Sequence, residues 1–156
     1  MNKVSRQPDY VFDPNHYPIT PGLRLIEASA GTGKTFALAH IVLRLLTEGK
    51  QSLRQLLVVT FTDASAAELR ARIGLRLEAA LDGLEALAGG SVPKASDPVL
   101  QEWLEQTGLE QQQRKTEQQI NAQRQQWICQ LLEALEGLDQ ADITTIHGFC
   151  RRTLRR

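Results

Sequence analysis

The sequence predicts an α/β fold in which helices flank a parallel β-sheet. Three short apolar runs, 23–27, 56–61 and 141–146, are each followed by a segment that reads as a helix. Strands that alternate with helices form parallel sheets, because each helix carries the chain back to the same edge. No apolar run reaches the roughly 18 residues of a membrane span, so we expect no membrane segment.

The first predicted strand, 23–27, follows a proline-rich stretch. Residues 1–20 contain Pro8, Pro14 and Pro18 and show little periodicity. They predict an extended arm over the domain surface, with simple disorder as the alternative. The run 23–27 alternates only loosely between apolar and charged residues, which is typical of a partly or fully buried strand.

The segment after this strand predicts a helix over 34–47. Its apolar residues recur at helical spacing, and they are Leu38, Ile41, Val42 and Leu45. Gly49 is suited to the left-handed position that ends a helix. The run 56–61 is apolar and partly β-branched, so it predicts a second, buried parallel strand.

A second long helix follows the run 56–61. Thr62 or Asp63 can cap its start, and the Asp63 carboxylate suits the positive end of a helix. A helical stripe runs along it, formed by Leu69, Ile73, Leu77, Leu81 and Leu84. The segment 89–93, with two glycines and a proline, breaks the pattern.

The composition then shifts toward glutamine between residues 97 and 138, while apolar residues keep a helical period. This predicts a helical subdomain of about three helices, with Trp103 and Trp127 as core anchors. The run 141–146 predicts a third strand, and a helix begins at His147. We therefore divide the chain into an arm (1–20), a first part of the main domain (21–90), a helical insertion (91–139) and a return segment (140–156).

A glycine-rich loop lies between the first strand and the first helix. It consists of Ala28, Ser29, Ala30, Gly31, Thr32, Gly33, Lys34 and Thr35. Glycines allow a tight turn that brings backbone N–H groups close to an anion, and the positive helix N-terminus points at the same place. The pattern differs from a complete phosphate-binding loop only in having Ala28 in place of the first glycine. A glycine-rich turn that caps an ordinary helix is the alternative.

Charge and cysteine content exclude some partners. The 18 Lys and Arg residues balance 18 Asp and Glu residues, so no global charge favours nucleic acid or membrane. A basic cluster stands at 151–156. Cys129 and Cys150 have no metal-type or redox-type spacing, which predicts free buried thiols, a reducing compartment and a cytoplasmic location.

Three segments together resemble the superfamily 1 DNA helicases of the UvrD/RecB type. They are the glycine-rich loop, the segment 59–69 (VTFTDASAAEL) and the segment 144–150 (TTIHGFC), in the same order as in that family. Within it, the loop and the last segment most resemble the exonuclease V beta subunits. The resemblance covers about residues 23–154 and implies a partial RecA-like P-loop domain with an inserted helical subdomain.

The resemblance also implies site residues, cofactors and partners. The loop would bind ATP, with Lys34 and Thr35 as catalytic residues and Thr35 also on Mg²⁺. DNA, single-stranded or at a duplex end, would be contacted by Phe61, Thr62, Thr145 and His147. The other subunits of an exonuclease V complex would be partners. The implied role is in recombination and double-strand break repair.

Several of these residues have a second interpretation. Phe61 could belong to the core, and His147 could be a helix cap without a ligand. Phe149 and Cys150 are expected in the core. A solvated helix face, with some chance of meeting phosphate, is expected for Arg70, Arg72 and Arg76.

The sequence lacks a counterpart of the family's later Asp-Glu pair and of its arginine fingers. Phosphoryl transfer depends on positioning and charge stabilisation, so we expect this chain to bind nucleotide but to hydrolyse it poorly. It would then be the N-terminal segment of a larger helicase. The alternatives are a stand-alone, non-catalytic module that binds nucleotide or DNA, and an unrelated P-loop kinase.

Overall fold

The computed structural model contains five helices and two strands in the residues that it describes, 12–27, 33–95, 97–112 and 116–154. The helices are α1 (Lys34–Thr47), α2 (Asp63–Ala88), α3 (Pro98–Gln112), α4 (Glu117–Glu136) and α5 (Ile146–Thr153). The strands are β1 (Leu57–Thr60) and β2 (Asp142–Thr145), and the 3₁₀ turns η1 (Leu53–Gln55) and η2 (Leu138–Gln140) precede them. The predicted mixed α/β class and the predicted parallel strands are therefore present.

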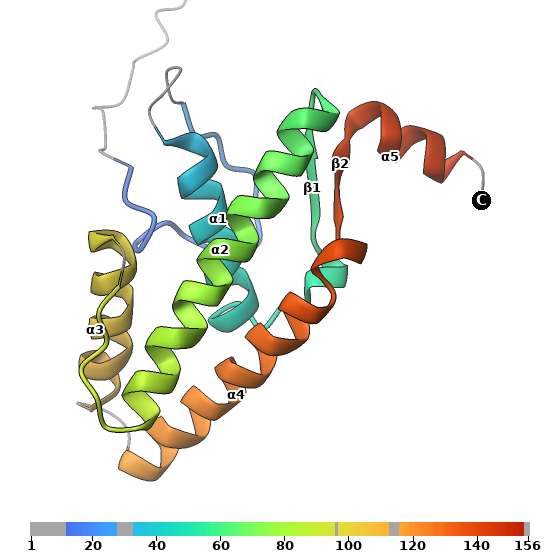
Figure 1. Cartoon of the computed structure of the whole chain (residues 1–156). Coiled ribbons are helices and arrows are strands. Elements are labelled where there is room, and N and C mark those ends of the chain that lie inside the picture. Colours follow the sequence, from blue (N-terminus) through green and yellow to red (C-terminus); the bar gives the residue numbers. More distant parts are fainter. Residues whose placement is uncertain (1–11, 28–32, 96, 113–115, 155–156) are drawn as a thin grey trace, which may run out of the picture.

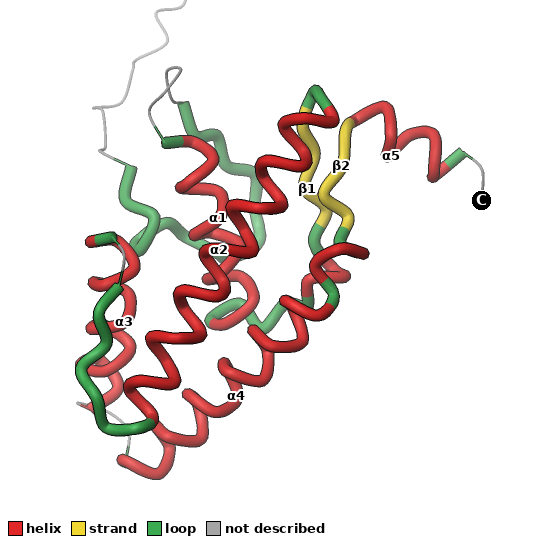
Figure 2. The backbone as a smooth tube through the Cα atoms, viewed as in Figure 1, coloured by secondary structure: helices red, strands yellow, loops and turns green. Residues whose placement is uncertain are grey.

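The two strands form a small parallel sheet at one side of the helices (Figure 2). Leu57 pairs with Asp142 and Thr60 with Thr145, in a continuous register. Helices α2, α3 and α4 connect β1 to β2, as a parallel crossover requires. The sheet face toward the helices carries Ile143, which is buried, whereas Leu57 and Val59 are exposed on β1. The expectation of a buried strand at 56–61 is therefore wrong, because Leu57, Val59 and Phe61 are exposed.

The hydrophobic core lies among α1, α2, α3 and α4. Its fully buried residues include Leu43, Ile73, Leu77, Leu84, Leu100, Leu104 and Leu131. Trp103 and Trp127 stack in this core with ring centroids 5.7 Å apart, which confirms their predicted role as anchors. Aliphatic and indole side chains thus bury most of the apolar area that stabilises the fold.

Local capping explains where several helices start. Thr62 caps α2 by accepting a hydrogen bond from Ser65 N–H, as predicted for Thr62 or Asp63. Thr116 and Gln119 form a reciprocal capping box at the start of α4. Helix α1 spans the predicted range, but the left-handed residue after it is Lys50, with φ 53°, rather than Gly49.

Three further sequence expectations differ from the structure. Residues 23–27 form no strand, because no described strand lies beside them and Arg24 binds locally to Pro18 and Thr20 oxygens. Leu23 and Leu25 are exposed. Residues 97–138 contain two long helices instead of three among those described. Cys129 and Cys150 are free, but exposed rather than buried.

Candidate nucleotide and nucleic-acid sites

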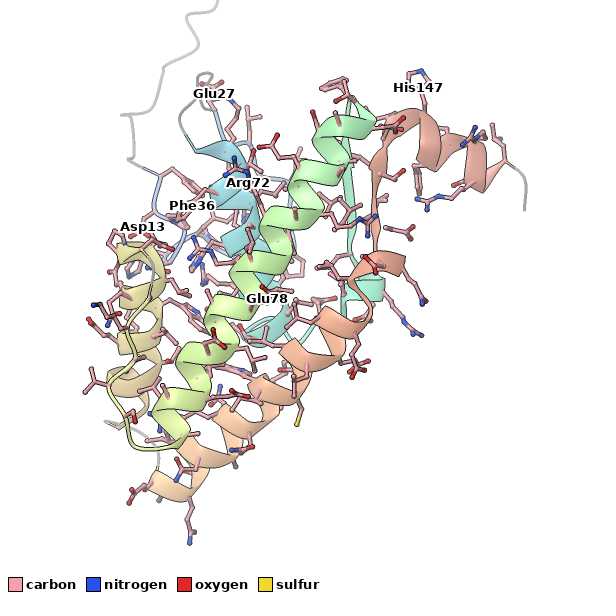
Figure 3. All side chains as sticks on the ribbon, in the orientation of Figure 1. Asp13, Glu27, Phe36, Arg72, Glu78 and His147 are labelled. Carbon is pink, nitrogen blue, oxygen red and sulfur yellow. The ribbon has the colours of Figure 1, made fainter. Side chains whose placement is uncertain are left out.

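The functional candidates gather at one end of the molecule. Figure 1 shows that α1, α2 and α5 all begin at the upper end, where β1 and β2 finish. In Figure 3, His147 lies at this end and points away from the helical core. Open α/β sheets place their ligands beyond the carboxyl ends of parallel strands, so this is the expected location for a site.

The nucleotide loop reaches the described structure at Gly33. Ala28, Ser29, Ala30, Gly31 and Thr32 lie outside the described residues, so their predicted role is not placed. Gly33 has φ 82°, which glycine adopts without strain. A Cβ atom there would meet nothing within 4 Å, so the backbone angle, not crowding, favours glycine.

The start of α1 suits an anion. Gly33 is its N-cap and contributes no side-chain hydrogen bond, whereas threonine side chains cap α2, α4 and α5. The first turn of a helix carries N–H groups without intrahelical acceptors and a partial positive charge. Lys34 is exposed and Thr35 is half-buried at this end. These residues fit a phosphate group and, through the Thr35 hydroxyl, a bound Mg²⁺ ion.

No cluster of side chains supplies further ligands for a Mg²⁺ ion beside the Thr35 hydroxyl in the described residues. No group of three His, Cys, Asp or Glu side chains that could hold a metal ion occurs in the described ranges.

The predicted DNA-contacting residues are brought together at the strand ends. Phe61 follows β1 and is 86% exposed, so the alternative that it belongs to the core is wrong. Thr145 is the last residue of β2, Thr62 lies two residues after β1, and His147 is exposed in the first turn of α5. An exposed aromatic ring beside polar side chains suits a nucleic-acid base and its backbone.

The two threonines serve first as helix caps. The Thr62 hydroxyl accepts from Ser65 N–H and donates to Ser65 Oγ at 2.7 Å. The Thr145 hydroxyl accepts from Gly148 N–H at 3.1 Å, and only 7% of Thr145 is exposed. Thr145 therefore caps α5, and the alternative role of His147 as the cap is wrong. Both threonines shape the strand ends whether or not they touch a ligand.

A hollow of about 360 Å³ lies beside these caps. It is lined by Asp63, Thr144, Thr145, His147, Gly148, Arg151 and Arg152. Arg151 and Arg152 were not among the predicted DNA residues, although the basic cluster at 151–156 was visible in the sequence. Arg152 is bound to Asp142 at 3.0 Å, with about half of each side chain exposed. Arg155 and Arg156 lie outside the described residues.

The expectation of a solvated arginine face on α2 holds for one of its three members. Arg72 is exposed and pairs with Glu68 on its own helix. Arg70 instead donates to the carbonyl oxygens of Leu138, Ala141 and Ile143, and so holds the chain that enters β2. The side chain of Arg76 is buried. Its partners are too distant in sequence for a helical pattern to predict.

The buried Arg76 lies next to the nucleotide loop helix. Its guanidinium carbon is 4.2 Å from the centroid of the Phe36 ring, and its Nη1 is 2.8 Å from Asp97 Oδ2. Figure 3 shows Phe36 and Arg72 on one side of the molecule, where they line a hollow of about 170 Å³ together with Arg76 and Asp97. Burial lowers the pKa of Arg76, and Asp97 opposes that change.

A second buried contact joins α1 to residues 12–20 and to α3. His40 Nε2 lies 2.7 Å from Asn15 Oδ1, and the Asn15 amide donates to Val99 O and to Glu102 Oε2. Asn15 Oδ1 is therefore the acceptor and His40 Nε2 the donor. Burial, with nearby Arg76 and Arg44 charges, lowers the pKa of His40 from 6.5 to about 4.

One turn further along α1, Arg44 holds the same segment. It donates to the carbonyl oxygens of Pro14 and Tyr17 and pairs with Glu48 at 2.8 Å. Glu48 also accepts from Trp103 Nε1 at 2.9 Å. The helix that begins at the nucleotide loop is thus fixed to α3 by specific polar contacts as well as by apolar packing.

Phe149 and Cys150 were expected in the core, but both are exposed on α5. Helix α5 lies beyond the sheet and contacts little of the helical core (Figure 1). In the described parts of the chain, no helix is long and apolar enough to cross a membrane.

Comparison with known proteins identifies a helicase domain in this chain. The UvrD/REP helicase N-terminal domain matches residues 16–156. The chain is 41% identical over 150 residues to the RecBCD enzyme subunit RecB of Escherichia coli, which covers 91% of this chain and 11% of that protein. It is 40% identical over 131 residues to the RecB subunit of Mycolicibacterium smegmatis, covering 84% of this chain and 10% of that protein.

A third relative is the RecB subunit of Chlamydia pneumoniae, 37% identical over 151 residues. That match covers 96% of this chain and 12% of the relative, so the chain spans only about a tenth of the length of these proteins. The match to the helicase domain nevertheless includes all of α1 to α5 and both strands. The chain therefore belongs to the UvrD/REP helicase family, through the N-terminal domain that defines it.

Proposed function

We propose that this chain is the N-terminal ATP-binding segment of a RecB-like, ATP-dependent DNA helicase and exonuclease that acts in recombination and double-strand break repair. The observation that carries the proposal is the start of α1. There a left-handed Gly33 and no capping side chain precede Lys34 and Thr35, inside a region that matches the helicase domain. The finer architecture would be a partial RecA-like P-loop domain with α3 and α4 as its helical insertion.

The proposed cofactors are ATP and Mg²⁺. The Lys34 ammonium would bind phosphate oxygens, and the Thr35 hydroxyl would be one ligand of Mg²⁺. Residues 28–32, the part of the motif that lies outside the described residues, would add backbone N–H groups around the phosphates. Bound Mg²⁺ would neutralise developing charge on the phosphates, while the chain's own residues bind and orient them.

The proposed macromolecular ligand is DNA, single-stranded or at a duplex end. Phe61 would stack on a base, while Thr62, Thr145 and His147 would face the backbone. Arg151 and Arg152 line the same hollow and would add positive charge near phosphates. Because the relatives are named as subunits of the RecBCD enzyme, other subunits of such a complex are proposed partners. Such a role would place the protein in the cytoplasm.

Nucleotide binding is tested by replacing Lys34. The Lys34→Ala chain should bind a fluorescent ATP analogue with Mg²⁺ about tenfold to a hundredfold more weakly, since a hydrogen bond to a charged group contributes about 1.5–3 kcal/mol. Lys94→Ala, at an exposed lysine remote from α1 in sequence, is the matched control. Equal affinity of the wild-type and Lys34→Ala chains would contradict the proposal.

A phosphate-release assay on the same chain measures ATP turnover. We expect ATP hydrolysis by this chain to stay near background with or without DNA, because it supplies neither a later acidic pair nor an arginine finger. Steady, DNA-stimulated phosphate release from the purified chain would show that this expectation is wrong.

DNA binding is tested with an oligonucleotide at low salt. Phe61→Ala should weaken binding by about 1–3 kcal/mol if the ring stacks on a base. Leu75→Ala removes a comparably exposed apolar side chain in the middle of α2 and should leave binding unchanged. The logarithm of affinity should fall with the logarithm of salt by about 0.7 per phosphate neutralised. An oligonucleotide that is not retained at low salt would contradict this part of the proposal.

A further inference from the structure

A side chain of α2 packs against the first turn of α1. Phe36 directly follows the proposed Mg²⁺ ligand Thr35, and the Arg76 guanidinium of α2 stacks on its ring at 4.2 Å. A buried guanidinium over an aromatic face is attracted by the ring quadrupole and fixes the ring plane. Through this stack, the first turn of α1, which carries Lys34 and Thr35, is fixed against α2.

The same guanidinium is attached to the start of α3. Arg76 Nη1 lies 2.8 Å from Asp97 Oδ2, and the two side chains are 5% and 22% exposed. The other oxygen of Asp97 accepts from Leu100 N–H at 2.9 Å, so this carboxylate also caps α3. A single carboxylate thus joins the first turn of α3 to the residue that orients Phe36.

Stability is a weak explanation for this arrangement. Removing two charges from water can cost as much as their attraction returns, and apolar residues of similar volume often stabilise a fold at least as well. Burial lowers the pKa of Arg76 because desolvation disfavours the charged guanidinium, and Asp97 opposes that change. What a hydrogen-bonded, stacked arginine does supply is a defined geometry among three elements: α1, α2 and α3.

We propose that Arg76 is a positioning residue for the nucleotide site, and that its ion pair with Asp97 couples nucleotide binding to the order of α3. This rests on the proposed function, because it takes the start of α1 as the nucleotide site. Coupling of this kind is reciprocal: if an intact Arg76–Asp97 pair favours bound nucleotide, bound nucleotide stabilises the start of α3 by the same factor.

The test uses the full chain with three substitutions. Arg76→Lys keeps a positive charge for Asp97 but loses the planar stack on Phe36. Asp97→Asn keeps a good helix cap but loses the ion pair. Arg72→Lys is the matched control, because Arg72 lies one turn earlier on α2, is exposed and pairs with Glu68 on its own helix. The probe is a fluorescent ATP analogue with Mg²⁺, and urea unfolding without nucleotide reports folding.

Two readouts separate positioning from plain structural support. Arg76→Lys and Asp97→Asn should each weaken nucleotide binding about fivefold or more, in the range usual for coupled sites. Nucleotide should slow amide hydrogen exchange in the first turn of α3 in the wild-type and Arg72→Lys chains. That slowing should disappear in Asp97→Asn, although its α3 is still formed.

The outcomes are distinguishable. If the wild-type chain binds nucleotide and both variants bind it equally well, with unchanged protection of α3, the inference is overturned while the proposed function stands. If the wild-type chain binds no nucleotide, both are overturned. Should Asp97→Asn unfold, Arg76→Lys with its retained charge still decides the question through nucleotide affinity.

Discussion

Helices α1 to α4 form one region of the molecule, and the strand ends with α5 form another, and the two differ in how deeply their apolar side chains are buried. In the first region, leucines, an isoleucine and two stacked tryptophans are buried, and buried polar groups such as His40 and Arg76 have specific partners. In the second, Phe61, Phe149 and Leu154 are exposed, and the polar contacts include two helix caps and a surface ion pair.

The difference separates residues that fold the chain from residues that can meet a ligand. Burial removes apolar area from water and stabilises the helical region. At the strand ends, the exposed aromatic and cationic side chains bury little area within this chain, so they are available for contact with a ligand. Changes in the first region should therefore alter unfolding, and changes in the second should alter ligand affinity.

The largest effect is expected from the core of α4. Leu131→Ala should lower the free energy of unfolding by about 2–5 kcal/mol, because Leu131 is 0% exposed and its loss leaves a cavity. Its neighbour Leu132 is 44% exposed, so Leu132→Ala should cost well under about 1 kcal/mol. Urea unfolding of both variants checks this, and equal destabilisation would mean that the assignment of faces on α4 is wrong.

The next effect is a pH dependence that comes from His40. Its pKa is about 4 when folded and 6.5 as the ordinary value, so the unfolded chain takes up the proton first. The stabilisation is complete above pH 6.5 and is lost as the pH falls toward 4, by about 3 kcal/mol in all. Protonation of folded His40 is unfavourable partly because its Nδ1 is buried with no hydrogen-bond partner among the described residues, so a proton there would have no acceptor.

Unfolding free energies at pH 7, 6, 5 and 4 test this dependence. The His40→Gln chain should lose less stability on acidification than the wild type does. His16→Gln is the surface control: the hydrogen bond to Asp13 raises the pKa of His16, so its small contribution is present below pH 6.5 and is lost as the pH rises. A His40→Gln chain with the wild-type acid dependence would refute the assignment.

The sequence predicted the elements whose signals are local. Helix α1 was predicted over its observed range because apolar residues recur at helical spacing within it and Gly49 and Lys50 follow its last turn. Thr62 as a cap is equally local. The strand at 23–27 was predicted wrongly. A strand forms only when it pairs with another strand, and a short apolar run does not indicate a pairing partner.

The candidate site shows the same limit. The loop and the strand-end residues could be named from motifs, since each motif is a short run. The contacts of Arg76 could not, because Phe36 and Asp97 lie 40 and 21 residues away along the chain and only packing brings them together. Arg70, which holds carbonyl groups near β2, escaped prediction for the same reason.

The smallest expected effect is at Thr145, where the two regions meet. Thr145→Ala removes the cap of α5 and should destabilise that helix by about 1 kcal/mol, whereas Thr145→Ser keeps the hydroxyl. A cap and a ligand contact can be told apart by comparison with His147→Ala. Loss of the cap should speed amide exchange at Gly148 and weaken oligonucleotide binding together.

His147 lies exposed in the same turn, so His147→Ala should weaken binding while exchange at Gly148 stays at the wild-type rate. If instead Thr145→Ala speeds exchange without changing affinity, the cap of α5 is not needed for binding, and the contribution of α5 rests on His147. If both variants leave affinity unchanged while Phe61→Ala reduces it, binding rests on base stacking and not on the hollow beside α5.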